Sequence, residues 1–306
     1  MPISFKEDHI SQIPALLMLE KLGYTYLTPD EALALRGGNL ANVLLEPVLR
    51  KQLAAINVVQ VSSVRTTVFS EQNITAGIDA LRNIPMDEGF MEASQTVYDL
   101  LTSGKTLEQI VDGDRKSFVM QYIDWKNPRN NVFHVTEEFA VSRTGMTETY
   151  RPDIVLFVNG IPLCVIECKR PAVKDSIEQA ISQHLRNQKA DGIRSLYLYS
   201  TLLLAINRQE GSYATTATPE KFWARWREQF TNREEEVRYR QELERVVNEP
   251  LLDDKLFGER FGYVRRNFEE LYRQPVIPSV QDEYLYNLCR PERLLQLRYG
   301  FTLYDD

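Results

Sequence analysis

The chain has 306 residues, of which 43% are hydrophobic and 26% are charged, and its formal net charge is −7. This composition is typical of globular proteins and gives no whole-chain signature of nucleic-acid binding, although a local basic groove is enough for such binding. The three cysteines and three histidines have spacings that argue against a disulfide framework and against a zinc site. The start lacks the apolar core of a signal peptide and no apolar run is long enough to cross a bilayer, so we expect a cytoplasmic protein without a membrane partner.

The first 130 residues are predicted to be mainly helical. Residues 8–23 carry apolar side chains at helical spacing, and Thr28-Pro29 is typical of the start of a second helix. Pro47 lies inside the amphipathic segment 41–56, where it either kinks a helix or begins a new one. Residues 71–101 predict two further short helices.

One segment of this region imitates a phosphate-binding loop. The string LTSGKT at 101–106 matches the end of the pattern G-x-x-x-x-G-K-[ST], but Asp99 stands where the first glycine is required and no buried strand precedes it. We therefore expect a helix that ends near Ser103 with Gly104 as its cap, followed by a helix capped by Thr106. The chain is not expected to bind ATP in this manner.

From Asn131 the sequence is rich in β-formers and predicts an α/β or α+β fold. Strands are predicted at 132–143, 152–158, 163–169, 202–207 and 211–216, with a helix at 174–188. After Thr218 the chain is again predicted to be helical, with a solvated charged face over 219–247 and an extended link at 273–280. The expected domains are 1–216, which has an amino-terminal helical part and a core at about 131–216, and 217–306, a helical extension and linker.

Charged residues lie at the ends of the central pair of strands. Asp153 precedes one strand, whereas Glu167 and Lys169 end the other, two residues apart and so on the same face. Such charges are costly beside a dry sheet unless something pairs with them. A purely structural salt bridge is one alternative; a site for a divalent metal is the other.

Metal-dependent hydrolysis of a phosphodiester bond uses residues of these types. A metal ion polarises the phosphate and lowers the pKa of a water molecule, and Mg²⁺ prefers carboxylate, carbonyl and water oxygens. We expect Asp153, Glu167 and the main-chain carbonyl of Cys168 to hold Mg²⁺, with Mn²⁺ as a substitute. Lys169 would stabilise the charge that develops in the transition state.

The residues Pro152-Asp153 and Glu167-Cys168-Lys169 resemble the PD-(D/E)xK nuclease motif. Longer stretches give a more specific likeness. VYDLLTSGKTLEQIVDGDRKSFVMQYIDW, RPDIVLFVNGIPLCVIECKRP, ISQHLRNQ and YATTATPEKFWARW, in this order, resemble the amino-terminal part of the restriction subunit of type I restriction–modification enzymes. The likeness covers nearly the whole chain.

The resemblance implies a restriction-endonuclease-like core, with a central mixed sheet flanked by helices, that cuts double-stranded DNA without reading its sequence. In that family the nuclease domain precedes an ATP-driven motor whose motifs are absent here, so ATP would act only through a motor outside this sequence. The resemblance also implies methyltransferase and specificity subunits as partners. Two other functions stay open: a non-catalytic docking module for such partners, and a standalone repair-type nuclease of the same fold.

Further site residues are implied by the resemblance. An acidic residue from an earlier helix often completes the metal site of this fold; Glu46 is the candidate, and a surface glutamate is the plain alternative. Gln179 matches the glutamine of the family's Q-x-x-x-Y element, but Gln183 replaces its tyrosine. The DNA-contact candidates, besides Gln179, are Arg170, Lys174, Arg186 and Lys189.

The turn between the two strands conflicts with a shared metal site. A two-residue loop at Asn159-Gly160 places Asp153 opposite Ile166, and therefore on the other face from Glu167. We predict instead a three- or five-residue loop, or a bulge near Asp153. In a metal-free structure Lys169 is expected to pair with one of the carboxylates.

Overall fold

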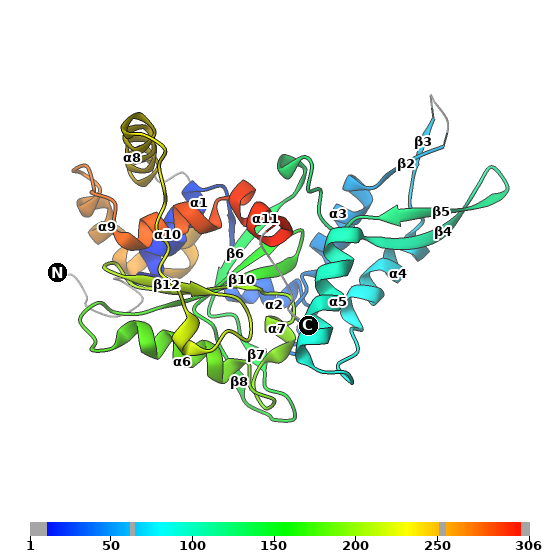
Figure 1. Ribbon diagram of the computed structural model, residues 1–306, viewed down its shortest axis with the longest axis horizontal. Helices are drawn as coiled ribbons and strands as arrows, with labels where there is room; N and C mark the ends of the chain where they lie inside the picture. Colours follow the sequence, from blue (N-terminus) through cyan, green and yellow to red (C-terminus); the bar gives the residue numbers. More distant parts are fainter. Residues whose placement is uncertain (1–10, 62–64, 251–254, 301–306) are drawn as a thin grey trace.

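The structure is a computed structural model that describes residues 11–61, 65–250 and 255–300. Its centre is a six-stranded mixed sheet (Figure 1). In spatial order the strands are β1 (Thr25–Leu27), β6 (Phe133–Glu137), β9 (Ile154–Val158), β10 (Ile161–Cys168), β11 (Leu202–Ile206) and β12 (Gly211–Ala214). The pairs β1–β6 and β10–β11 are parallel and the other pairs are antiparallel. The predicted α/β class, with a central mixed sheet flanked by helices, is confirmed.

Strands β9 and β10 form the middle of the sheet because their sequences are apolar almost without interruption. Every residue of both strands is buried, as expected for strands that are covered on both faces. Their one charged residue is Glu167, at the end of β10. An ionisable group at such a position needs a partner or a function.

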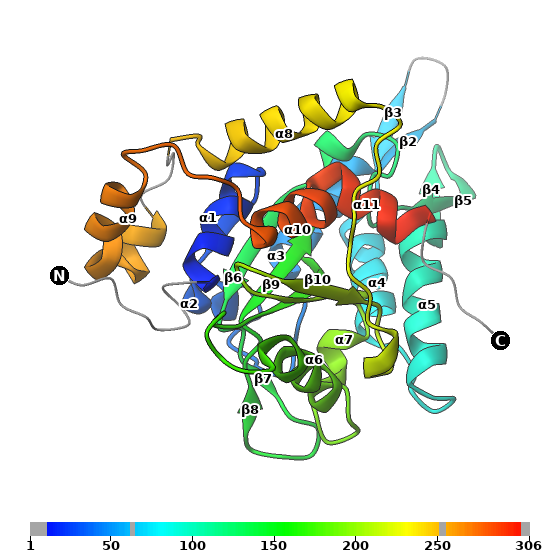
Figure 2. The same ribbon diagram turned by 60° about the vertical axis from the view of Figure 1, so that its left-hand side comes forward.

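Helices cover the two faces of this sheet. In Figures 1 and 2, α1 (Ile13–Lys21), α10 (Val280–Cys289) and α11 (Pro291–Gly300) lie on one side, and α6 (Ser176–Asn187) and α7 (Arg194–Tyr197) lie on the other. The apolar stripe of α6 packs against Ala205 of β11. The predicted helices at 8–23 and 174–188 are confirmed, except that residues 8–10 lie outside the described part of the chain.

The remaining N-terminal elements stand at one end of the sheet (Figure 1). They are α3 (Glu46–Ile56), α4 (Glu71–Arg82) and α5 (Phe90–Ser103), with the strand pairs β2 (Val58–Gln60) with β3 (Thr66–Val68) and β4 (Lys105–Val111) with β5 (Asp114–Met120). The short helix α2 (Pro29–Ala34) instead contacts β1 and β6. Pro47 begins a new helix instead of kinking one, because it occupies the first turn of α3. Gly104 caps α5 with φ +79°, as predicted.

The prediction of a helix after Gly104 is wrong. Residues 105–111 form strand β4, in which exposed and partly buried side chains alternate, and this period of two is that of a strand. A further short pair, β7 (Val141–Ser142) with β8 (Thr149–Tyr150), follows β6 in the chain.

After β12, regular helix begins further along the sequence than predicted. Only a short 3₁₀ turn forms at Glu220–Phe222, and α8 (Arg233–Val247) begins at the cap Asn232. The segment between them is extended because Ala224 exchanges main-chain hydrogen bonds with Tyr213 at the sheet edge. A tertiary contact here overrides the helical pattern of the sequence.

The C-terminal helices share the core of the sheet. After α8 come the helical turns Leu256–Arg260 and Gly262–Val264, and α9 (Arg265–Leu271). The extended link predicted at 273–280 is confirmed for residues 275–279, since 273 and 274 still belong to the turn after α9 and α10 begins at 280. Leu285 and Leu288 of α10 then join the hydrophobic cluster that contains β9 and β10. The division at residue 216 stays a prediction. Across the described ranges, no helix has the length and apolarity needed to span a bilayer.

Candidate active site

The strand pair β9–β10 has the two-residue turn that its sequence favours. Asn159 and Gly160 have φ angles of +52° and +84°, and Val158 pairs with Ile161. The Asn159 side chain accepts a hydrogen bond from the Val132 N–H at 2.9 Å and is fully buried, so this turn is locked into the core. The predicted three- or five-residue loop is therefore wrong.

A bulge directly after the turn corrects the register. Pro162 and Cys164 pair with adjacent residues of β9, so Leu163 is an extra residue. In consequence Asp153 and Glu167 lie side by side at the far end of the strand pair. A bulge was predicted, but its place was wrong: it lies beside Pro162, which has no N–H for the ladder, and not near Asp153.

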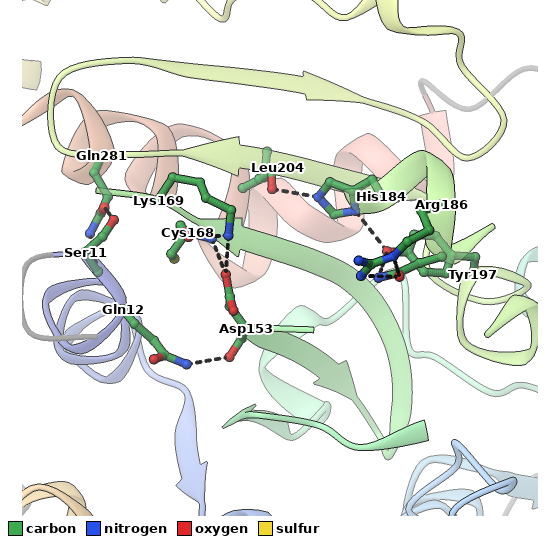
Figure 3. Close-up of polar contacts among 11 residues, drawn as sticks. Ser11, Gln12, Asp153, Cys168, Lys169, His184, Arg186, Tyr197, Leu204 and Gln281 are labelled. Carbon is green, nitrogen blue, oxygen red and sulfur yellow. Dashed lines mark hydrogen bonds and ion pairs between the residues drawn. The ribbon is translucent and has the colours of Figure 1, made fainter. Parts of the chain in front are cut away.

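Asp153 and Lys169 are mostly buried, with side-chain exposures of 19% and 13%, and they lie close together (Figure 3). The Cys168 N–H donates to Asp153 Oδ2 at 2.7 Å, and Lys169 Nζ lies 3.5 Å from the same oxygen. Lys169 Nζ also donates to the Cys168 carbonyl at 2.9 Å. The predicted pairing of Lys169 with a carboxylate is confirmed, and its ammonium contacts two of the three groups expected to bind a metal ion.

Glu167 lies deeper in the protein. It is fully buried, and among the described residues neither of its carboxylate oxygens has a hydrogen-bond partner. Burial raises the pKa of Glu167 well above its usual range, the charge of Asp153 raises it further, and the ammonium of Lys169 lowers it in part. The neighbouring cations therefore do not offset burial, and the neutral form of Glu167 is favoured.

The donor set suits a hard cation. Two carboxylates and a main-chain carbonyl offer only oxygen atoms, which is the preference of Mg²⁺. Within residues 11–61, 65–250 and 255–300 no group of three or more acidic, histidine or cysteine side chains is placed to hold a metal. A cation here would therefore complete its coordination with water and substrate oxygens, as Mg²⁺ usually does.

Glu46 is not part of this cluster. The N–H of Leu45 donates to the carbonyl of Gly160, so the start of α3 lies at the turn, at the opposite end of β9 from Asp153. At ~3.3 Å per strand residue the two ends are about 20 Å apart. Glu46 instead accepts hydrogen bonds from Asn42 at 2.8 Å and Arg82 at 2.5 Å, so the predicted metal ligand is a structural ion-pair partner.

Arg186, in the last turn of α6, has no carboxylate partner among the described residues. Its guanidinium donates to Asn187 Oδ1 at 3.1 and 3.3 Å and stacks 4.3 Å from the centroid of Tyr150, and Arg143 stacks 4.7 Å from the same ring. The charge of Arg186 also lowers the pKa of Glu167, after the larger effects of burial, Asp153 and Lys169. Tyr150 is a missed residue, since nothing in its local sequence indicates the stacking.

The other predicted DNA contacts vary in exposure. Lys174 is 91% exposed, and Lys189 is also exposed. Gln179 is exposed and donates to the carbonyl of Lys174 at 3.0 Å, which ties it to the start of α6. Arg170 is partly buried at the end of β10.

A second buried network supports α6 (Figure 3). His184 Nε2 lies 2.9 Å from the carbonyl of Leu204, so this nitrogen carries the proton and Nδ1 accepts from the Tyr197 hydroxyl at 3.0 Å. Burial lowers the pKa of His184 to about 4, so the ring is neutral. The sequence contained a signal for this residue, because positions 177, 180, 181 and 184 share one helical stripe.

Comparison with known proteins gives the family. Residues 4–222 match the family model of the type I restriction enzyme R protein N terminus. The chain belongs to this family. The resemblance noted from the sequence is therefore confirmed, and the cluster of Asp153, Glu167 and Lys169 lies within the matched region.

Individual proteins similar to this chain support the same family. The chain is 27% identical over 228 residues to a putative type I restriction enzyme MjaIXP endonuclease subunit of Methanocaldococcus jannaschii, covering 72% of this chain and 20% of the relative. It is 29% identical over 206 residues to the type I restriction enzyme HindI endonuclease subunit of Haemophilus influenzae, covering 65% of this chain and 18% of the relative. The chain thus spans about a fifth of the length of these curated relatives.

Proposed function

We propose that the chain is a Mg²⁺-dependent endonuclease domain with a PD-(D/E)xK core that hydrolyses phosphodiester bonds of double-stranded DNA. The observation that carries the proposal is Glu167, a fully buried carboxylate without a hydrogen-bond partner among the described residues, next to Asp153 and Lys169. A structural salt bridge does not require an unpaired buried acid, and leaving one uncompensated is costly. A metal ligand accounts for it.

The residues have distinct roles in this proposal. Asp153, Glu167 and the Cys168 carbonyl would hold Mg²⁺, which when bound polarises the phosphate and activates a water molecule. The Cys168 N–H fixes one oxygen of Asp153, so this carboxylate is oriented before the cation arrives. Lys169 would exchange its contacts with these oxygens for the phosphate and stabilise negative charge in the transition state.

Basic side chains around the cluster would bind the DNA backbone. Arg186 is the leading candidate because its charge acts on Glu167 and its guanidinium is ordered by Tyr150 and Asn187. Lys174, Lys189, Arg170 and Gln179 would extend this contact. Phosphate contacts carry no sequence information, which agrees with cutting that is independent of local sequence.

The whole protein would act as one subunit of a larger assembly. The relatives are named as endonuclease subunits and are about five times longer than the matched region. We propose that methyltransferase and specificity subunits supply target recognition, and that ATP acts through a motor outside this sequence. A non-catalytic docking role is the alternative, and it requires no divalent-cation site.

Site variants in the assembled enzyme test this function. Asp153→Ala, Glu167→Gln or Lys169→Ala in the full-length subunit should lower DNA cleavage by about 10²–10³-fold, since each removes a group that acts on the phosphate, while ATP hydrolysis is retained. Glu244→Gln, on the exposed face of α8, is the matched control and should cut normally. Normal cleavage by the site variants, or a Ca²⁺ titration of the 306-residue chain that is unaffected by Glu167→Gln, would support the docking role instead.

A further inference from the structure

Asp153 is held from outside the sheet by the first turn of the N-terminal helix. Gln12, which directly precedes α1, donates from Nε2 to the main-chain carbonyl of Asp153 at 3.0 Å (Figure 3). The same carbonyl accepts the N–H of Glu138 at 3.1 Å. Gln12 is only 6% exposed, so its amide is dedicated to this contact and not shared with solvent.

The position of Gln12 depends in turn on α10. Ser11 Oγ donates to Gln281 Oε1 at 2.6 Å, and Gln281 Nε2 donates back to the carbonyl of Ser11 at 2.9 Å (Figure 3). Both residues are fully buried. A reciprocal pair of buried hydrogen bonds fixes one relative placement of two helices, because any shift leaves buried polar groups unsatisfied.

The opposite side of Asp153 faces the expected cation. Its Oδ2 accepts the Cys168 N–H, so the carboxylate and the carbonyl of this residue are anchored by different elements. Moving the carbonyl would rotate the main chain at residue 153 and with it the carboxylate. Two sets of hydrogen bonds, Gln281 with Ser11 and Gln12 with Asp153, are therefore joined by the peptide bond between Ser11 and Gln12 and connect α10 to Asp153.

We infer that Gln12 and Gln281 are positioning residues for the cation site, through which helix α10 sets the orientation of Asp153. The inference rests on the proposed function, because a cation at Asp153 is what the orientation serves. It also gives the segment after residue 217 a direct influence on catalysis, although that segment contributes none of the expected metal ligands.

Calorimetric titration of the 306-residue chain with Ca²⁺ tests the inference. Gln12→Met keeps the size of the side chain but removes its donor, and it should weaken Ca²⁺ binding by about 10–100-fold, as outer partners of metal ligands do. Gln281→Leu should weaken it by about tenfold although it lies on another helix. The double variant should bind no more weakly than Gln12→Met alone, because both changes interrupt one path.

A second bond of α10 supplies the control. The Tyr284 hydroxyl donates to the Gly211 carbonyl at 2.5 Å and accepts from the Trp226 N–H at 2.9 Å, on the edge strand β12, which β10 and β11 separate from β9. Tyr284→Phe should therefore leave Ca²⁺ affinity unchanged while it lowers stability. Ser11→Ala, which deletes one hydroxyl, replaces Gln281→Leu if the leucine variant does not fold.

Two results would overturn the inference. One is an unchanged Ca²⁺ affinity in Gln12→Met. The other is a double variant whose fold-loss of Ca²⁺ affinity equals the product of the fold-losses in the two single variants. If the wild-type chain binds no Ca²⁺ and cuts no DNA, the proposed function fails, and amide exchange of Cys168 in the metal-free chain decides the positioning alone. Exchange about tenfold faster in Gln12→Met supports it, and unchanged exchange contradicts it.

Discussion

Glu167 is the residue at which stability and the proposed activity conflict. Its pKa is raised because burial and the charge of Asp153 disfavour the ionised form. Between the ordinary value of 4.5 and the raised value, the folded chain therefore keeps a proton that the unfolded chain has released. The stabilising contribution is complete below pH 4.5 and is lost as the pH rises through the raised pKa.

Glu167→Gln should therefore stabilise the metal-free chain at high pH. The amide keeps the shape of the side chain and cannot ionise, so we expect a free energy of unfolding higher by about 1–3 kcal/mol at pH 8 and nearly equal to that of the wild type at pH 4. Urea titration at the two pH values measures the difference. Glu244→Gln should change neither value, and a wild type as stable as Glu167→Gln at pH 8 would show that the charge is already compensated.

The site residues that could be predicted from the sequence are those in a recognisable spacing of charged side chains. Those that act through tertiary contacts could not be predicted. Asp153, Glu167 and Lys169 meet because the ends of adjacent strands meet. Gln12 could not have been found, since its partner lies 141 positions away in the chain. Glu46 was assigned wrongly because the sequence does not say at which end of the strand pair α3 begins.

At the scale of elements, the pair β9–β10 combines a predictable turn with an unpredictable bulge. Asn-Gly favours a two-residue turn and this is what forms, whereas the bulge was placed wrongly because both strands are apolar apart from Glu167 and either register buries their apolar residues. The same limit applies to residues 219–232. Their charge pattern is helical, yet a main-chain contact at the sheet edge holds part of them extended.

The turn also fixes α3, so Gly160 should tolerate no side chain. A Cβ at this position would lie 2.6 Å from the Leu45 carbonyl oxygen and 3.1 Å from the Leu49 nitrogen, at a φ of +84°. Gly160→Ala should lower the free energy of unfolding by about 2–4 kcal/mol, the sum of left-handed strain and a main-chain clash. Denaturant titration of the 306-residue chain gives the value.

Gly113 provides the matched control for this change. It occupies the β4–β5 turn at a φ of +86°, and a Cβ added to it would meet no atom within 4 Å. Gly113→Ala should therefore carry only the left-handed strain, about 1 kcal/mol. Equal losses of the free energy of unfolding in the two variants would show that the contact between the turn and α3 rearranges without lowering stability.

At the scale of the whole molecule, the helices after residue 217 are bound into the core of the sheet. Tyr284, Leu285 and Leu288 of α10 are buried in the same cluster as β9 and β10. Burying three side chains of this size stabilises by up to about 5–9 kcal/mol. The net stability of a folded domain is only about 5–15 kcal/mol, so losing this burial is enough to offset a large part of that margin.

A chain that ends at residue 216 should therefore not fold cooperatively by itself. It keeps the whole sheet but loses the helix that covers one face of it, including Gln281, which anchors Ser11. We expect urea unfolding of residues 1–216 to be shallow and without a single steep transition, whereas residues 1–300, which retain α10 and α11, unfold in one transition. Adding residues 217–306 as a separate chain should restore part of the cooperativity. A steep transition in residues 1–216 alone would instead establish the boundary that the sequence predicts, and would mean that α10 lies on a core that is complete without it.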